Sequence, residues 1–190
     1  MNKSRLEAFT DAIVAIAATI MVLQLSIPSA PTWQGLGENG IKLLAYLVSF
    51  LMIYLGWFAH HNLFKKAERI TTRTFTINGF WIFLCSLVPF TAAWVGHAPN
   101  AVAPEVLYHA NLLLWRISFQ LLDRQILHDN PDAEPDSSRD KAERWTYYLA
   151  FAVSIAIDLA RPLWGMYATA LLTGVMVVRS LTSPEAASHG

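Results

Sequence analysis

Long apolar blocks follow one another along the chain and are separated by short polar clusters. A soluble fold hides its apolar residues in stripes, whereas continuous blocks of this kind are typical of helices in a bilayer. At about 1.5 Å per residue, a hydrocarbon core of about 30 Å needs about 20 residues. The pattern therefore predicts an all-α, polytopic membrane protein. Its six predicted transmembrane helices cover residues 4–27, 41–64, 74–94, 104–122, 145–159 and 162–181.

The segments between these blocks are short. Residues 1–182 are therefore expected to form one six-helix unit, without a convincing repeat between its halves. Residues 128–144 contain turn signals and are expected to link the fourth and fifth helices. We expect residues 183–190 to be a disordered cytoplasmic tail.

Composition agrees with a membrane protein. Of the 190 residues, 54% are hydrophobic and 15% are charged, which is too apolar for a soluble domain of this length. The net charge is zero and no basic run exceeds two residues, so nothing indicates a nucleic-acid surface. The single cysteine, Cys85, lies in an apolar block and is expected to be a small buried hydrophobe.

The start of the chain also has features of a secretory signal, because Lys3 and Arg5 precede an apolar run. Glu7 and Asp11 interrupt that run, and Pro31 follows the nearest small residues, where cleavage is disfavoured. We therefore expect the first helix to remain in the mature protein.

Lysine and arginine fall mainly on one side of the six-helix layout, with Lys42 and Arg161 as exceptions. Because cytoplasmic loops carry an excess of these residues, both termini are predicted to be cytoplasmic in a multi-pass protein of the cell membrane. The residues on the predicted cytoplasmic side are Lys3, Arg5, Lys65, Lys66, Arg69, Arg73, Arg124, Arg139, Lys141, Arg144 and Arg179.

The first predicted helix is unusually polar for a membrane span. Arg5, Glu7 and Asp11 lie in its cytoplasmic half, where a carboxylate is costly unless it is paired or hydrated. Arg5 and Asp11 are about 120° apart around the helix, so each needs a partner elsewhere. Alanines are dense along this helix and let neighbouring helices approach closely. We expect protein to pack around most of it.

The cytoplasmic end of the second helix offers partners for Asp11, and these are Trp57, His60, His61 and Phe64. One interpretation is a buried network of Asp11, Thr10 and one histidine that fixes the first helix. A histidine beside a carboxylate also titrates near neutral pH, so pH sensing is the alternative. A metal site at the two histidines is disfavoured, because adjacent side chains point about 100° apart on a helix.

A stripe of residues at helical spacing runs along the middle of the first helix. One interpretation is a packing seam between helices. The other is a pore: if several copies of this helix surrounded an axis, a ring of Ile16 would form a dry constriction near the bilayer centre. The stripe consists of Ile16, Thr19, Ile20, Leu23 and Ile27.

The residues Arg5-Leu-Glu-Ala-Phe9-Thr10-Asp11, followed by Ala15-Ile16-Ala-Ala-Thr19, form a recognisable motif. The motif resembles the R-x-x-x-F-S-D signature on the first helix of the lysosomal potassium channel family, transmembrane protein 175, in its bacterial single-repeat form. The stretch from Trp57 to Phe64, with His60 and His61, is similar to the second helix of that family. One departure is visible, since Thr10 stands where the signature has serine.

The resemblance implies a moderately selective potassium channel that lacks a re-entrant filter loop, and the sequence contains no Thr-Val-Gly-Tyr-Gly stretch. It implies a pore lined by the first helix, with a constriction at Ile16, a polar layer at Thr19 and further apolar rings at Ile20 and Leu23. A chain with one six-helix unit is expected to form a homotetramer in membrane lipid. Potassium ions are the expected permeant species, and neither a cofactor, a resident metal nor a nucleic-acid partner is expected.

Other polar positions in or beside the predicted spans favour a different function. They suggest a small proton- or cation-coupled secondary transporter, although internal repeats and paired broken helices are missing from the sequence. A membrane enzyme is disfavoured, because no nucleophile or metal constellation accompanies the two adjacent histidines. The polar positions are His109, Asn111, Arg116 and Asp158.

Overall fold

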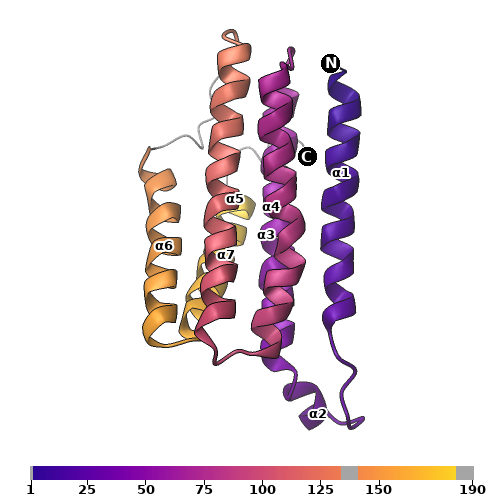
Figure 1. Cartoon of the computed structure of the whole chain (residues 1–190), viewed down its shortest axis with the longest axis vertical. Helices are drawn as coiled ribbons and strands as arrows, with labels where there is room; N and C mark the ends of the chain where they lie inside the picture. Colours follow the sequence, from indigo (N-terminus) through magenta and orange to yellow (C-terminus); the bar gives the residue numbers. More distant parts are fainter. Residues whose placement is uncertain (1, 134–140, 183–190) are drawn as a thin grey trace.

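The computed structural model describes residues 2–133 and 141–182, and these residues form helices without any strand. The predicted all-α class is therefore confirmed for this part of the chain. Consecutive long helices run antiparallel along the long axis of the molecule (Figure 1). The elements are α1 (Lys3–Ile20), η1 (Met21–Gln24), α2 (Trp33–Gly37), α3 (Gly40–Lys65), α4 (Thr72–His97), α5 (Val102–Asp129), α6 (Lys141–Ala160) and α7 (Trp164–Thr182).

Side-chain caps mark where several helices begin. Asn2 precedes α1 and its side-chain oxygen accepts from the backbone N–H of Arg5. Thr71 caps α4 in the same way, accepting from the N–H of Thr74 at 3.2 Å. Pro104 lies in the first turn of α5, where a missing N–H costs nothing. Local chemistry therefore sets these starts, since each cap satisfies an N–H that has no partner inside its helix.

Helix ends differ from the sequence prediction. The first helix was predicted to reach residue 27, but its α-helical part ends at Ile20, followed by a single 3₁₀ turn and extended backbone at Leu25. Pro162 precedes α7 instead of starting it. α5 continues to Asp129, seven residues beyond the predicted span. The apolar pattern reports bilayer thickness, whereas backbone hydrogen bonds continue through polar residues, so the two boundaries differ.

Two predicted features fall on segments outside the described residues. The predicted disordered tail, residues 183–190, lies there entirely. The predicted linker, residues 128–144, lies there in part, since the structure describes its beginning in α5 and its end in α6.

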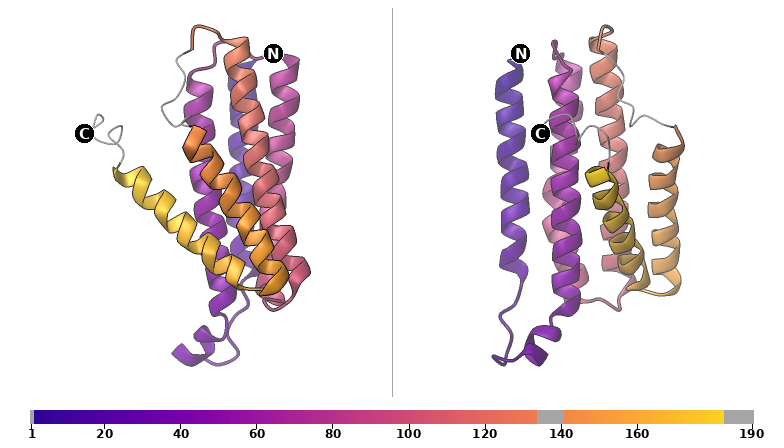
Figure 2. Two further views of the ribbon diagram at one scale, coloured as in Figure 1. Left: turned by 90° about the vertical axis from the view of Figure 1, so that its left-hand side faces the viewer. Right: turned by 180° about the vertical axis from the view of Figure 1, so that it is seen from behind.

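α4 occupies the centre of the bundle and α1 lies at its edge (Figures 1 and 2). α4 packs against α1, α3 and α5, while α6 and α7 pack on the far side of α5 and α3. In its most apolar stretch, 56% of α4 is buried, against 28% for the helix formed by α1 and η1. α1 contacts α3 and α4 and leaves most of its circumference uncovered by its own chain.

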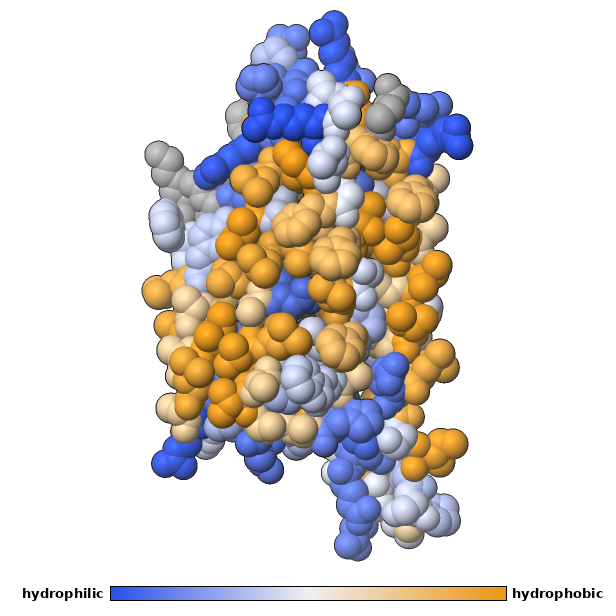
Figure 3. All heavy atoms as spheres, in the orientation of Figure 1, coloured by the Kyte–Doolittle hydropathy of each residue, from blue (hydrophilic) through white to orange (hydrophobic). Residues whose placement is uncertain are grey.

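Apolar side chains form a broad belt around the middle of the molecule, and hydrophilic ones gather at its two ends (Figure 3). Within the described residues, three helices are long and apolar enough to cross a membrane: Lys3–Gln24, Gly40–Lys65 and Thr72–His97. α5 is less apolar because it carries buried polar residues, such as Glu105 and Asn111. The six-span layout therefore stays a prediction.

The C-terminal end of α5 is hydrogen-bonded to the turn between α3 and α4. The Asn130 side-chain oxygen accepts from the backbone N–H groups of Glu68 and Arg69, at 2.9 and 2.7 Å. Thr71 Oγ1 donates to Asp129 Oδ2 at 2.7 Å, and Thr74 donates to the same oxygen. Asp129 thus supplies a negative charge at the N-terminus of α4, where the helix dipole favours it.

Candidate functional site

The two faces of α1 differ sharply in burial. One face packs against α3 and α4, with Val14 and Ala17 only 4% and 2% exposed. The opposite face is turned away from the rest of the chain. There Ile16 is 58% exposed, and Leu23, in the η1 turn that follows α1, is 78% exposed. Within one chain, α3 and α4 therefore cover only one face of α1. The predicted packing of protein around most of α1 requires other molecules.

The predicted pore residues all lie on the uncovered part of this helix. Ile16, Ile20 and Leu23 are exposed apolar side chains, and Thr19 is exposed between them. The Thr19 hydroxyl donates back to the helix, 2.9 Å from the carbonyl oxygen of Ala15 and 3.0 Å from that of Ile16. Leu23 lies in the 3₁₀ turn, so its position departs from the α-helical spacing used to predict the stripe.

The buried face of α1 is fixed by a chain of polar side chains. Thr10 is fully buried, and its hydroxyl accepts from Asn78 Nδ2 at 2.9 Å while donating to the carbonyl oxygen of Leu6. Asn78 Oδ1 lies 2.8 Å from His60 Nε2, and the His60 ring stacks between Phe64 and Trp81. This network joins α1, α3 and α4.

Sequence reasoning missed Asn78. The signal was present, because Asn78 is an amide inside an otherwise apolar block, where a polar side chain needs a buried partner. The predicted pairing of Thr10 with a histidine is therefore indirect, since Asn78 stands between Thr10 and His60.

Asp11 is paired with Trp57, one of the candidate partners predicted on the second helix, and not with a histidine. Its carboxylate accepts from Trp57 Nε1 at 2.9 Å, and the His61 ring stacks on Trp57 with centroids 5.8 Å apart. Among the described residues, no hydrogen bond joins Asp11 to His60 or His61. The predicted single buried network of aspartate, threonine and histidine is wrong in this respect, because Asp11 is exposed at the side of α1.

Arg5 and Phe9 lie outside both contacts. Both are exposed, and the helical spacing places them on the same face as Ile16. The residues of the signature motif and of the similar stretch on the second helix therefore fall into three groups. Thr10 and His60 belong to the buried network, Asp11 and Trp57 form a separate hydrogen bond, and Arg5 and Phe9 extend the exposed stripe.

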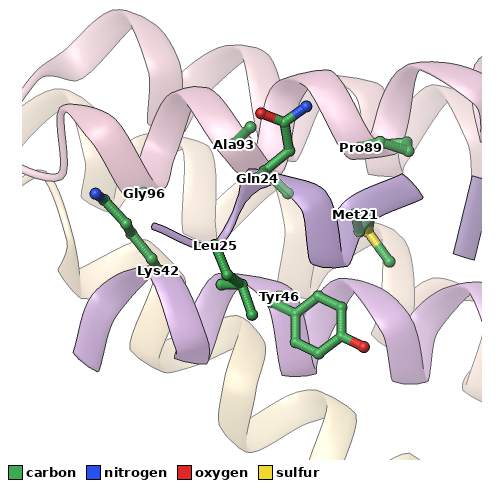
Figure 4. A pocket seen from close by; sticks show the side chains of 9 residues that line it. Met21, Gln24, Leu25, Lys42, Tyr46, Pro89, Ala93 and Gly96 are labelled. Atoms are coloured by element: carbon green, nitrogen blue, oxygen red, sulfur yellow. The ribbon is translucent and has the colours of Figure 1, made fainter. Parts of the chain in front are cut away.

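A small hollow lies at the far end of α1, between η1, α3 and α4 (Figure 4). Its volume of about 20 Å³ holds little more than one water molecule. Met21 and Gln24 line it from one side, and Tyr46 and Pro89 from the others. Nearby, Lys42 Nζ donates to Ser26 Oγ at 2.9 Å. This region anchors the end of α1 and contains none of the exposed stripe.

The residues that suggested a transporter do not gather into one site. His109 and Asp158 are in contact, as described below. The Arg116 guanidinium lies two turns further along α5, 5.0 Å from the ring centroid of Tyr147. Asn111 Nδ2 donates to the backbone oxygen of Leu84 on α4. Each of these groups therefore has its own local partner.

The family model for the endosomal/lysosomal potassium channel TMEM175 matches residues 5–89, which hold nearly all of α1, all of α3, most of α4 and every predicted site residue. A potassium channel of Chryseobacterium sp. strain P1-3 is 34% identical over 127 residues, which make up 67% of this chain and 66% of that protein. The chain belongs to the TMEM175 family. The resemblance seen in the first two helices is thus confirmed.

Further TMEM175 relatives match smaller shares of their own length. A potassium channel of Streptomyces collinus is 35% identical over 98 residues, or 48% of its length. The endosomal/lysosomal proton channel TMEM175 of Bos taurus is 41% identical over 83 residues, or 17% of its length. The aligned region therefore spans about two thirds or less of these curated relatives.

The fold agrees with a solved TMEM175 structure. The crystal structure of a lysosomal potassium-selective channel TMEM175 homolog from Chamaesiphon minutus superimposes with a TM-score of 0.78 at 25% identity. The match covers 94% of this chain and 97% of that chain, so it includes the three C-terminal helices as well as the first three long ones. TMEM175 proteins are ion channels, so this chain is not an enzyme.

Proposed function

We propose that this protein is a moderately selective potassium channel that conducts passively through a homotetrameric pore lined by α1. The observation that carries the proposal is the uncovered stripe on α1, in which a threonine hydroxyl lies among exposed apolar side chains. The names of the bacterial relatives and of the similar crystal structure support potassium as the permeant ion.

Lipid contact alone is a poor explanation for this face. Besides Ile16 and Phe9, this face of α1 exposes Arg5, and charged groups on a membrane helix usually face protein or water. It also exposes small side chains, Ala8, Ala12 and Ala15, which allow close approach between helices. These features favour contact with other copies of α1 around an aqueous axis.

One chain supplies one α1 and cannot enclose a pore alone. Several copies must therefore surround an axis, and a single six-helix unit per chain favours four. The sequence contains no Thr-Val-Gly-Tyr-Gly stretch from which a filter of the backbone-carbonyl type would be built, so no such filter is proposed. Side chains of α1 then supply the constriction.

The proposed gate is hydrophobic. A narrow ring of Ile16 excludes ions when it is dry, and opening requires α1 to shift enough to hydrate it. Sodium holds its water more tightly than potassium, so a partly dehydrated potassium ion passes the ring more easily. Oxygens of Thr19, one turn away, replace part of the lost hydration.

The test is ion flux through the purified full-length protein in liposomes and planar bilayers. Ile16→Asn makes the ring polar, so we expect a larger resting potassium flux and a lower potassium-to-sodium permeability ratio. Ile117→Asn is the matched control, since Ile117 is an exposed isoleucine on α5, away from α1. Unchanged flux and selectivity in a well-assembled Ile16→Asn protein would remove Ile16 from the gate.

A cation-coupled transporter is the second candidate, because His109 and Asp158 form a buried ionisable pair inside the bundle. The same recordings distinguish the two functions. A channel gives single-channel steps and potassium flux down its gradient without a co-substrate, whereas a transporter gives neither.

A further inference from the structure

A second polar cluster lies where α5, α6 and α7 meet. Glu105 and His109 lie one turn apart on α5, and Asp158 faces them from α6. All three side chains are fully buried. One carboxylate oxygen of each acid and one ring nitrogen of the histidine lie within 4.8 Å of one another. None of these residues belongs to α1, α3 or α4, so the cluster is separate from the proposed pore.

The histidine is held from both sides. His109 Nδ1 lies 2.6 Å from Asp158 Oδ2 and 3.0 Å from the backbone oxygen of Glu105. Its other nitrogen, Nε2, lies 2.8 Å from the hydroxyl oxygen of Thr169 on α7. The ring orientation is thus fixed, with Nδ1 directed toward the Asp158 carboxylate and the backbone carbonyl of Glu105.

Three carboxylate oxygens in the cluster lack a hydrogen-bond partner among the described residues. They are both oxygens of Glu105 and Asp158 Oδ1. The backbone of Leu163 comes near Glu105 without reaching normal hydrogen-bond geometry. A buried carboxylate without a donor is costly, and a second carboxylate beside it adds repulsion. Within residues 2–133 and 141–182, no positively charged side chain is hydrogen-bonded to these oxygens.

We propose that Glu105, His109 and Asp158 bind one divalent transition-metal ion, with zinc as the reference ion. Two carboxylates and a neutral imidazole carry two negative charges, which balance such an ion, and nitrogen with oxygen ligands suit zinc. Thr169 is the positioning residue, because a hydrogen bond to the second ring nitrogen orients a metal-binding histidine.

The cluster is close to the geometry that this ion requires. Bond lengths of about 2.0–2.2 Å place ligand atoms about 3.3 Å apart around tetrahedral zinc. His109 Nδ1 and Asp158 Oδ2 therefore need to separate by less than about 1 Å as the ion replaces the proton between them. Gly165 leaves room for Asp158, since a β-carbon at that position would collide with its carboxylate.

The turn between α6 and α7 covers the cluster. In this turn Leu163 has a positive φ of 77°, which is uncommon for a residue with a side chain. The turn brings its backbone near Glu105 and leads directly into Gly165. A bound ion would join α5 to α6 beneath this turn, with α7 holding the histidine, so its role is to stabilise the C-terminal half of the bundle.

The decisive measurement uses the full-length protein in detergent, stripped with a chelator, supplied with excess zinc and then desalted. We expect about one zinc ion per wild-type chain, measured by elemental mass spectrometry. Glu105→Gln and His109→Gln each remove one ligand and should lose the ion. His97→Gln is the matched control, because His97 is an exposed histidine whose removal leaves the cluster intact.

Thr169→Val tests the positioning role and retains all three ligands. It should weaken zinc binding about 10- to 100-fold, measured by competition with a coloured chelator. A purely structural effect of this substitution would lower thermal stability without changing zinc affinity, and that result would remove Thr169 from the site.

If the ligand variants do not fold, the wild-type protein alone decides the question. X-ray absorption of its bound zinc should show one imidazole in a nitrogen and oxygen shell. Absence of retained zinc overturns the proposal, as does equal retention by Glu105→Gln and His109→Gln proteins. An infrared band of a protonated buried carboxyl in metal-free wild-type protein, together with no zinc binding, would assign the missing positive charge to a proton.

Discussion

The hydroxyl of Thr10 carries the polar contact between α1 and α4. It is fully buried and accepts a hydrogen bond from Asn78. The serine of the family signature has the same hydroxyl, so the threonine of this chain can make the same hydrogen bond. The added methyl group of threonine fits within the packed face of α1, beside Leu6 and Val14.

Thr10→Val should destabilise the protein by about 1–3 kcal/mol, because it keeps the shape of the side chain but leaves buried Asn78 without its acceptor. Thr10→Ser is the matched control and should cost much less. Thermal midpoints in detergent measure the difference. Equal midpoints for the two variants would contradict the role of the hydroxyl.

The hydrogen bond between Asp11 and Trp57 is the second residue-scale contact that fixes α1. Asp11→Ala and Trp57→Phe should each lower stability, and the double variant should lose less than the sum of the two. We expect a coupling of about 1 kcal/mol, because one hydrogen bond to a charged group is shared by both residues. Strictly additive effects would show that the pair contributes no stability.

At the scale of elements, the apolar blocks predicted the existence and order of the six long helices but not their ends. Helix ends depend on caps and tertiary partners, which hydropathy does not encode. The end of α5 is an example, since Asp129 and Asn130 bind a turn that lies about sixty residues earlier in the sequence. Sequence reasoning named Trp57 among the possible partners of Asp11. The position of Asn78 between Thr10 and His60 could not be predicted, because it depends on how α4 packs against α1.

The strength of the hydrogen bonds between Asp129 and the first turn of α4 should depend on pH. Burial tends to raise the pKa of Asp129, but hydrogen bonds from Thr74, Thr71, Gln125 and His128 outweigh burial and lower this pKa below its ordinary value. A lowered folded-state pKa stabilises the fold above the unfolded-state value of about 4, and this stabilisation disappears as the pH falls through the folded-state pKa.

Asp129→Asn should therefore lower the thermal midpoint at pH 7, with a cost of about 1–2 kcal/mol. The difference from wild type should shrink as the pH falls below about 4. Asp132→Asn is the control, because Asp132 is exposed beyond the end of α5. A difference in thermal midpoint that stays constant down to pH 3 would contradict a stabilising role of the ionised Asp129 carboxylate.

At the scale of the whole molecule, α1 has one packed face and one uncovered face. Sequence reasoning placed Ile16, Thr19, Ile20 and Leu23 on one stripe, and that stripe lies on the uncovered side. The cluster of Glu105, His109 and Asp158 was harder to predict, because its members come from two helices separated by about fifty residues. Two of its members were noted as polar positions, and only the packing of α5 against α6 joins them.

If α1 surrounds the axis of the assembly, cysteines placed on its uncovered face should crosslink between chains. Ile16→Cys, in a Cys85→Ala background, should give disulfide-linked dimers on mild oxidation, visible on non-reducing gels. Leu171→Cys is the matched control, because Leu171 is also strongly exposed but lies on α7. Equal crosslinking at both positions, or none at Ile16→Cys, would contradict a central α1.

The direction of one hydrogen bond gives the proposed pore a preference for the sign of charge. The Thr19 hydroxyl donates its only proton to the carbonyl oxygen of Ala15 or of Ile16. The oxygen therefore has only lone pairs to offer to an ion. A ring of such oxygens attracts a cation and offers no donor to an anion. Chloride would thus be excluded because the Thr19 hydroxyl is already hydrogen-bonded to the backbone. This exclusion would need no negatively charged side chain in the pore lining.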